Sequence, residues 1–118
     1  MNYKPVGKHT LAEFEGCPFH ILDDKKYLEQ TLENVAKEIG ATVLFANSYK
    51  FDPQGVSVFT MLSESHISIH TYPEEGLAFF DCFTCGETID PDKTIPLLKE
   101  KLKATDVHKH PTLRRGRS

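Results

Sequence analysis

The chain has 118 residues, of which 26% are charged and 39% apolar, and its formal net charge is -3 at pH 7. This size and composition fit one globular domain over residues 1–118, and the slightly acidic balance argues against a nucleic-acid-binding protein, which usually presents a basic face. No apolar run reaches the roughly 18 residues that a membrane span needs. Three cysteines fit a reducing compartment better than a disulfide framework, so we expect a cytoplasmic protein.

The first half of the chain predicts a strand, a helix and a second strand. Residues 8–15 alternate loosely between apolar and polar side chains, which indicates a strand. From Asp24 to Gly40 the period changes to that of a helix, with an aspartate to cap its start and a glycine where it ends. Its apolar stripe consists of Leu28, Leu32, Val35, Ala36 and Ile39. Residues 41–51 are rich in β-branched and aromatic side chains and predict the second strand.

The second half predicts more strands and one more helix. Strands are expected over residues 56–62, 66–71 and 77–84, separated by turns at 52–55 and 73–76. Asp90 and Pro91 open a helix in the favoured order of cap and then proline. Val107 belongs to a short edge strand, and we expect residues 111–118 to form a flexible tail.

Consecutive strands joined by short turns favour antiparallel pairing. The predicted fold class is therefore α+β, with a mainly antiparallel sheet and helices on one face. The strand at 66–71 alternates between two sets of side chains, Ile67, Ile69 and Thr71 on one face and His66, Ser68 and His70 on the other. Because several strands carry apolar residues on both faces, we expect a second sheet or subunit to pack on the face without helices, most simply in a homodimer.

Residues 55–86 hold most of the reactive side chains, and a zinc site is the first possibility. His66 and His70, with Cys82 and Cys85, have spacings like those of zinc ligands. On a strand, however, the two histidines lie about 13 Å apart, too far to share one ion. The two cysteines point to opposite faces, and no helix begins beside them as a redox motif requires. We therefore expect no metal and interpret Cys82 as a buried apolar residue.

Ser65 stands between a carboxylate and an imidazole at the junction of two predicted strands. No hydrolase signature surrounds it. A serine in such a junction can instead attack the preceding carbonyl, converting the Glu64–Ser65 amide to an ester, and elimination then leaves a pyruvoyl group. The reaction needs a base and an oxyanion donor within a few ångströms. The candidates are His70, Ser57 and Cys85.

The segments GVS, ESHISIHTYPE and DCFTCG together resemble the prokaryotic S-adenosylmethionine decarboxylases, and the similarity extends over nearly the whole chain. The resemblance implies a two-layer α/β sandwich whose protomers pair, and cleavage between Glu64 and Ser65. It also implies that Ser65 becomes the pyruvoyl cofactor, that His70 and Ser57 act in self-processing, and that Cys85 is the catalytic proton donor.

For the substrate, the resemblance implies that Phe51 stacks on adenine and Glu74 binds the ribose hydroxyls, and Tyr72 offers a second aromatic face. The chain departs from the family near this end, with DPQG in place of LPYG and TYPEE in place of TWPEY. The cofactor carbonyl condenses with the substrate amine and serves as an electron sink while CO2 leaves.

The implied function is a self-processing pyruvoyl-dependent S-adenosylmethionine decarboxylase that supplies the aminopropyl donor for spermidine and other polyamines. A pyruvoyl-dependent arginine or ornithine decarboxylase is an alternative, because Asp52 and Glu75 are additional acids that could pair with a cationic substrate. A non-catalytic module that binds a small molecule or metal, and a regulatory paralogue that pairs with an active partner, are further alternatives.

Overall fold

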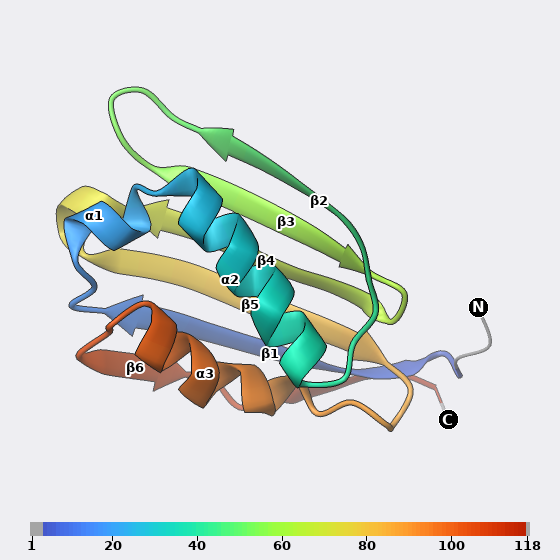
Figure 1. Cartoon of the computed structure of the whole chain (residues 1–118). Coiled ribbons are helices and arrows are strands. Elements are labelled where there is room, and N and C mark those ends of the chain that lie inside the picture. Colours follow the sequence, from blue (N-terminus) through green and yellow to red (C-terminus); the bar gives the residue numbers. More distant parts are fainter. Residues whose placement is uncertain (1–3, 118) are drawn as a thin grey trace.

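The computed structural model describes residues 4–117 as one sheet with helices on one of its faces (Figure 1). In chain order the elements are β1 (Val6–Glu15), α1 (Phe19–Leu22), α2 (Lys25–Glu38), β2 (Val43–Lys50), β3 (Val56–Leu62), β4 (Ser65–Tyr72), the 3-10 turn η1 (Pro73–Glu75), β5 (Leu77–Cys85), the 3-10 turn η2 (Pro91–Lys93), α3 (Thr94–Lys101), β6 (Asp106–Lys109) and β7 (Leu113–Gly116).

The sheet runs in the order β2-β3-β4-β5-β1-β6, and β7 also pairs with β1. Every pairing is antiparallel. The strands from β2 to β5 follow one another as hairpins. Strand β1, from the start of the chain, pairs with the other edge of β5. This confirms the predicted α+β class with a mainly antiparallel sheet.

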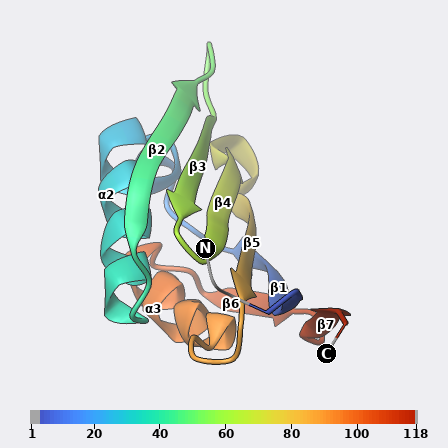
Figure 2. The same cartoon turned by 90° about the vertical axis from the view of Figure 1, so that its right-hand side faces the viewer.

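Helices α2 and α3 lie on the same side of the sheet, and within residues 4–117 the other side carries no α-helix (Figure 2). The strand alternation is the predicted one, since Ile67 and Ile69 are buried beneath the helices while His70 is exposed on the opposite side. The main sheet residues in this core are Ala12, Phe14, Val56, Val58, Ile67, Ile69, Ala78 and Phe80. We call the side without helices the open face.

The long helix is confirmed nearly residue for residue. The Asp24 side chain accepts a hydrogen bond from the Tyr27 amide at 3.0 Å, and Gly40 has a φ of 91° after the helix ends. Pro96 lies in the first turn of α3, where a missing N–H costs no intrahelical bond. Among the helices of the described chain, none is long and apolar enough to cross a membrane.

The expected flexible tail is wrong for most of its length. Residues Leu113–Gly116 form β7, which pairs with the first half of β1, and Arg117 donates a backbone hydrogen bond to Pro5. The Arg115 guanidinium lies over the Phe83 ring at 5.6 Å. The physical reason is the free edge of β1, whose backbone groups need partners, and a polar tail can supply them. Ser118 lies outside the described residues.

Candidate active site

The backbone is strained at Ser65, where β4 begins. Its φ is 152°, in a region that residues other than glycine rarely adopt. The strain lies directly after the tight β3–β4 connection and places the Glu64–Ser65 peptide at the end of the sheet. Such outliers cluster at functional sites because the surrounding structure must hold them.

The carbonyl of Glu64 is held by a short hydrogen bond. Its oxygen accepts the Cys85 backbone N–H at 2.7 Å, and the Ser65 hydroxyl lies 3.5 Å from the Cys85 sulfur. Glu64 is only 5% exposed, and its carboxylate accepts the Thr42 amide at 3.0 Å. The peptide preceding Ser65 is therefore fixed from both sides, with a thiol beside the serine oxygen.

A second group of predicted residues lies at the other end of β3 and β4. The Ser57 hydroxyl is 2.8 Å from His70 Nδ1. Both residues line a cavity of about 440 Å³, and its other lining residues are Phe51, Gln54, Gly55, Thr71, Tyr72 and Glu74. The three residues expected to contact a nucleoside thus share one cavity with the Ser57–His70 pair.

The cavity wall is ordered by contacts from neighbouring loops. The Gln54 amide donates to Glu74 Oε2 at 3.2 Å. The Asp23 carboxylate accepts the Gly55 amide at 2.9 Å and pairs with Lys50 at 3.1 Å, and these contacts lower its pKa below the ordinary value, with the Gly55 bond as the largest cause.

Within one chain the structure does not bring the two groups together. Ser65 and His70 are five residues apart on one strand, which corresponds to about 16 Å. We expected His70, Ser57 and Cys85 to be the candidates within a few ångströms of Ser65. Cys85 lies there, but His70 and Ser57 of the same chain do not. Residues that are only five positions apart in the sequence are far apart in space when they lie on one extended strand.

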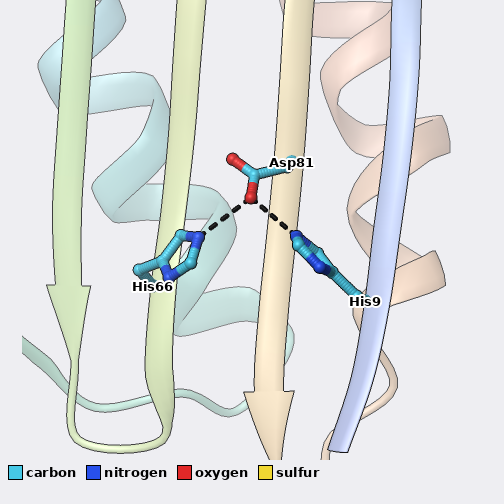
Figure 3. A group of neighbouring side chains, drawn as sticks. All are labelled: His9, His66 and Asp81. Atoms are coloured by element: carbon cyan, nitrogen blue, oxygen red, sulfur yellow. Dashed lines mark hydrogen bonds and ion pairs between the residues drawn. The ribbon is translucent and has the colours of Figure 1, made fainter. Parts of the chain in front are cut away.

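A network on the open face joins three strands and was missed in the sequence. Asp81 Oδ2 lies 2.7 Å from His9 Nε2 and 2.9 Å from His66 Nε2 (Figure 3), and Ser68 donates to the other carboxylate oxygen. Burial alone would raise the pKa of Asp81, but the hydrogen bonds from His66, Ser68 and His9 outweigh it and hold the pKa well below its usual range. These residues are far apart in sequence, so only the pairing of β1, β4 and β5 shows them as neighbours.

The cysteines take separate roles in the structure. Cys82 is fully buried in the core, where burial raises the pKa of its thiol to about 12. Cys85 is partly exposed at the end of β5, beside Ser65. The interpretation of Cys82 as a buried apolar residue is confirmed.

Comparisons with known proteins agree with this geometry. The family model described as S-adenosylmethionine decarboxylase matches residues 8–116. The chain is 47% identical over 105 residues to the S-adenosylmethionine decarboxylase proenzyme of Thermosipho africanus, covering 89% of this chain and 81% of that protein. It is 49% identical over 100 residues to the proenzyme of Methanococcus maripaludis, covering 85% and 82%.

A solved structure gives the same result for the fold. The crystal structure of the adenosylmethionine decarboxylase from Aquifex aeolicus VF5 superposes with a TM-score of 0.88 at 31% identity, covering 98% of this chain and 94% of that one. The fold and site thus define an α/β sandwich of the kind found in carboxy-lyases made as proenzymes. The chain belongs to the S-adenosylmethionine decarboxylase family, which confirms the resemblance seen in its sequence.

Proposed function

We propose that this protein is a pyruvoyl-dependent S-adenosylmethionine decarboxylase that cleaves itself between Glu64 and Ser65. The observation that carries the proposal is the Glu64 carbonyl, which accepts the Cys85 amide at 2.7 Å immediately before a strained serine. A carbonyl held in this way is polarised toward attack, and the same N–H stabilises the oxyanion that attack produces.

Self-processing uses atoms that the chain itself supplies. Ser65 Oγ attacks the Glu64 carbonyl carbon, the C–N bond to Ser65 breaks, and the acyl group passes from nitrogen to oxygen. A base then removes the Ser65 α-proton, the Cβ–Oγ bond of residue 65 breaks, and residues 1–64 leave with a new C-terminal α-carboxylate on Glu64, so that residue 65 becomes dehydroalanine. Water finally displaces the nitrogen as ammonia, so that residue 65 carries the pyruvoyl group.

The base is the role proposed for His70, oriented by Ser57, and it must come from a second copy of the chain. Within one chain His70 is about 16 Å from Ser65 along the strand. In a two-fold homodimer that pairs the open faces in opposite directions, each Ser65–Cys85 end meets the partner's cavity, so two complete sites form. The site is incomplete without this pairing.

The open face supports such a dimer. Phe59 and Phe79 lie on it with 38% and 41% of their surface exposed, and Phe45 on β2 is 54% exposed. Several exposed aromatic side chains on one face of a sheet favour an interface there, because burying them removes apolar area from water. The same face carries Ser57 and His70, so the interface and the site coincide.

For turnover, the pyruvoyl group at residue 65 supplies the electron sink needed for loss of CO2. The Cys85 thiol, which stays reduced in the cytoplasm, delivers a proton to the substrate carbon after CO2 leaves. Phe51 and Tyr72 offer aromatic faces to the adenine, and the Glu74 carboxylate accepts two ribose hydroxyls. The product amine serves as the aminopropyl donor of spermidine synthesis.

The cavity favours this substrate over arginine or ornithine. Glu74 is a lining residue, whereas Asp52 and Glu75 are exposed and do not line the cavity. A distal guanidinium or ammonium group would need carboxylates that line the cavity in addition to Glu74. The two additional acids of the sequence are therefore in the wrong place to select a cationic amino acid.

Two measurements test the proposal. Intact-mass analysis of the purified protein is expected to show two fragments, residues 1–64 and residues 65–118 with a blocked N-terminus, and Ser65→Ala is expected to remain one chain. The processed enzyme is expected to release CO2 from S-adenosylmethionine and not from arginine or ornithine. A chain that stays uncleaved after prolonged incubation would overturn the proposed self-cleavage. Release of CO2 from arginine or ornithine alone would overturn the proposed substrate.

A further inference from the structure

Two histidines that the proposed chemistry does not use lie at the end of the outer strand β6. His108 and His110 are two residues apart, so their side chains share one face and are separated by about 7 Å along the strand. Two imidazoles at this spacing can reach one ion through bonds of about 2.1 Å. The same criterion excludes His66 and His70, which are twice as far apart.

A carboxylate from the neighbouring strand completes the group. Glu13 on β1 is directly opposite His108 in the register, and the His110 amide continues the pairing by donating to the Leu11 carbonyl at 3.0 Å. Both Glu13 carboxylate oxygens lie 3.0 Å from His110 Nε2. The rings of His108 and His110 have centroids 4.7 Å apart. One donor atom from each of the three side chains lies within 4.8 Å of the others.

We propose that Glu13, His108 and His110 form a binding site for a first-row divalent metal ion, with Zn2+ as the favoured ion. Two imidazoles and one carboxylate form a common zinc donor set, to which water can add the fourth ligand. The ion takes the place of the hydrogen bonds between His110 and Glu13. The side chains of Glu13 and His110 are 26% and 43% exposed, so an ion can enter without opening the fold.

The surroundings leave the carboxylate available to a metal. Lys109, the cation between the two histidines, points away from this face and pairs with Asp92 at 3.5 Å. A bound ion joins β6 to β1, where the two strands share four register pairs. Because the site exists only in the folded chain, binding raises the melting temperature.

The network of Asp81 with His9 and His66 has the same donor types, but it is less suited to a metal. Its carboxylate already accepts Ser68 as well as both imidazoles. The Arg115 guanidinium also lies 3.3 Å from His9 Nδ1, where it repels a second positive charge. A test of the proposed site must therefore tell the two groups apart.

The test is calorimetric titration of the full-length protein, free of any affinity tag, with Zn2+, together with the visible absorption of bound Co2+. We expect one ion per chain and a higher melting temperature with Zn2+. His110→Gln and Glu13→Gln are each expected to weaken binding at least about tenfold, which corresponds to roughly 1.4 kcal/mol. His20→Gln, at an exposed histidine elsewhere, and His9→Gln are expected to bind as the wild type does.

Two results overturn the proposal. One is that the wild-type protein does not bind Zn2+, and the other is that both His110→Gln and Glu13→Gln bind it as tightly as the wild type does. Loss of binding in His9→Gln with binding retained in His110→Gln assigns the ion to the Asp81 network instead. Melting curves without metal establish that each variant is folded, and His108→Gln replaces any variant that is not.

Discussion

The backbone N–H of Cys85 donates a hydrogen bond of 2.7 Å to the carbonyl oxygen of Glu64. The same residue places its sulfur 3.5 Å from the Ser65 hydroxyl. One residue therefore presents two separate groups to the proposed cleavage site, an amide that suits oxyanion stabilisation and a thiol that suits proton transfer. The two functions depend on different atoms and can be separated by mutation.

Cys85→Ala is expected to leave self-processing largely intact and to damage turnover. The substitution keeps the backbone N–H that holds the Glu64 carbonyl, but it removes the acid proposed to protonate the substrate carbon. We expect kcat to fall by about 10²–10⁴-fold, the usual contribution of a general acid. Mass analysis for cleavage and CO2 release for turnover measure the two effects. Normal decarboxylation by the cleaved variant would show that Cys85 is not the proton donor.

The proposed site, shared between two chains, predicts complementation between two inactive variants. Ser65→Ala and His70→Ala, produced separately, are each expected to remain uncleaved or to cleave very slowly. In a mixed dimer, one of the two sites contains Ser65 from the His70→Ala chain and His70 from the Ser65→Ala chain. Co-expression is therefore expected to cleave the His70→Ala chain and leave the Ser65→Ala chain intact.

Distinct affinity tags on the two chains allow mass analysis to identify which one is cleaved. Pairing each variant with the double variant Ser65→Ala/His70→Ala is the control, because no mixed site is then complete. If His70→Ala cleaves on its own at the rate of the wild type, or if co-expression restores nothing although mixed dimers form, residues from two chains do not share the site.

The sequence was informative wherever a local pattern determined the structure. The period of α2 and its aspartate cap, the turn signals and the alternation in β4 depend on neighbouring residues, and the structure confirms them. The chemistry expected at Ser65 named Cys85, together with His70 and Ser57, as a group close to it, and of these three Cys85 lies beside it in the same chain. These features follow from backbone geometry within one element or one hairpin.

The remaining features depend on contacts between distant segments. The tail forms β7 because β1 has an unpaired edge, and nothing within residues 111–118 encodes that edge. Asp81 meets His9 only because β1 returns to pair with β5. The rise of a strand already predicts the separation of Ser65 from His70, because five residues span about 16 Å. The motif places the two residues close together in sequence, which is not closeness in space.

Asp81→Asn is expected to destabilise the protein by about 1–3 kcal/mol near neutral pH, because the charged hydrogen bonds from two imidazoles and Ser68 are weakened. The pKa of Asp81 in the folded protein lies below its value in the unfolded chain, which is about 3.9. The unfolded chain therefore takes up the proton first. The stabilisation is present above about pH 4 and is lost as the pH falls through the folded-state pKa.

Denaturant unfolding of wild type and Asp81→Asn between about pH 3.5 and 7 measures this difference. We expect the gap in the free energy of unfolding to be largest at the upper end and to narrow below about pH 4. Asp52→Asn, at an exposed turn position, is the matched control and is expected to change the free energy of unfolding only slightly. A gap that widens on acidification would contradict the assigned direction of the pKa shift.

Gln54 is expected to position Glu74, whose carboxylate is proposed to bind the ribose. Its amide donates to Glu74 Oε2 at 3.2 Å, and both residues line the cavity, so loss of the amide leaves Glu74 free to rotate away from the substrate. One such hydrogen bond is worth about 0.5–1.5 kcal/mol, so Gln54→Ala is expected to raise KM for S-adenosylmethionine by roughly 2- to 13-fold. Since Gln54 does not touch the reacting atoms, kcat and cleavage are expected to stay near wild type. Gln30→Ala, at an exposed site on α2, is the matched control. A fall in kcat without a rise in KM would show that Gln54 acts on the chemistry and not on the position of Glu74.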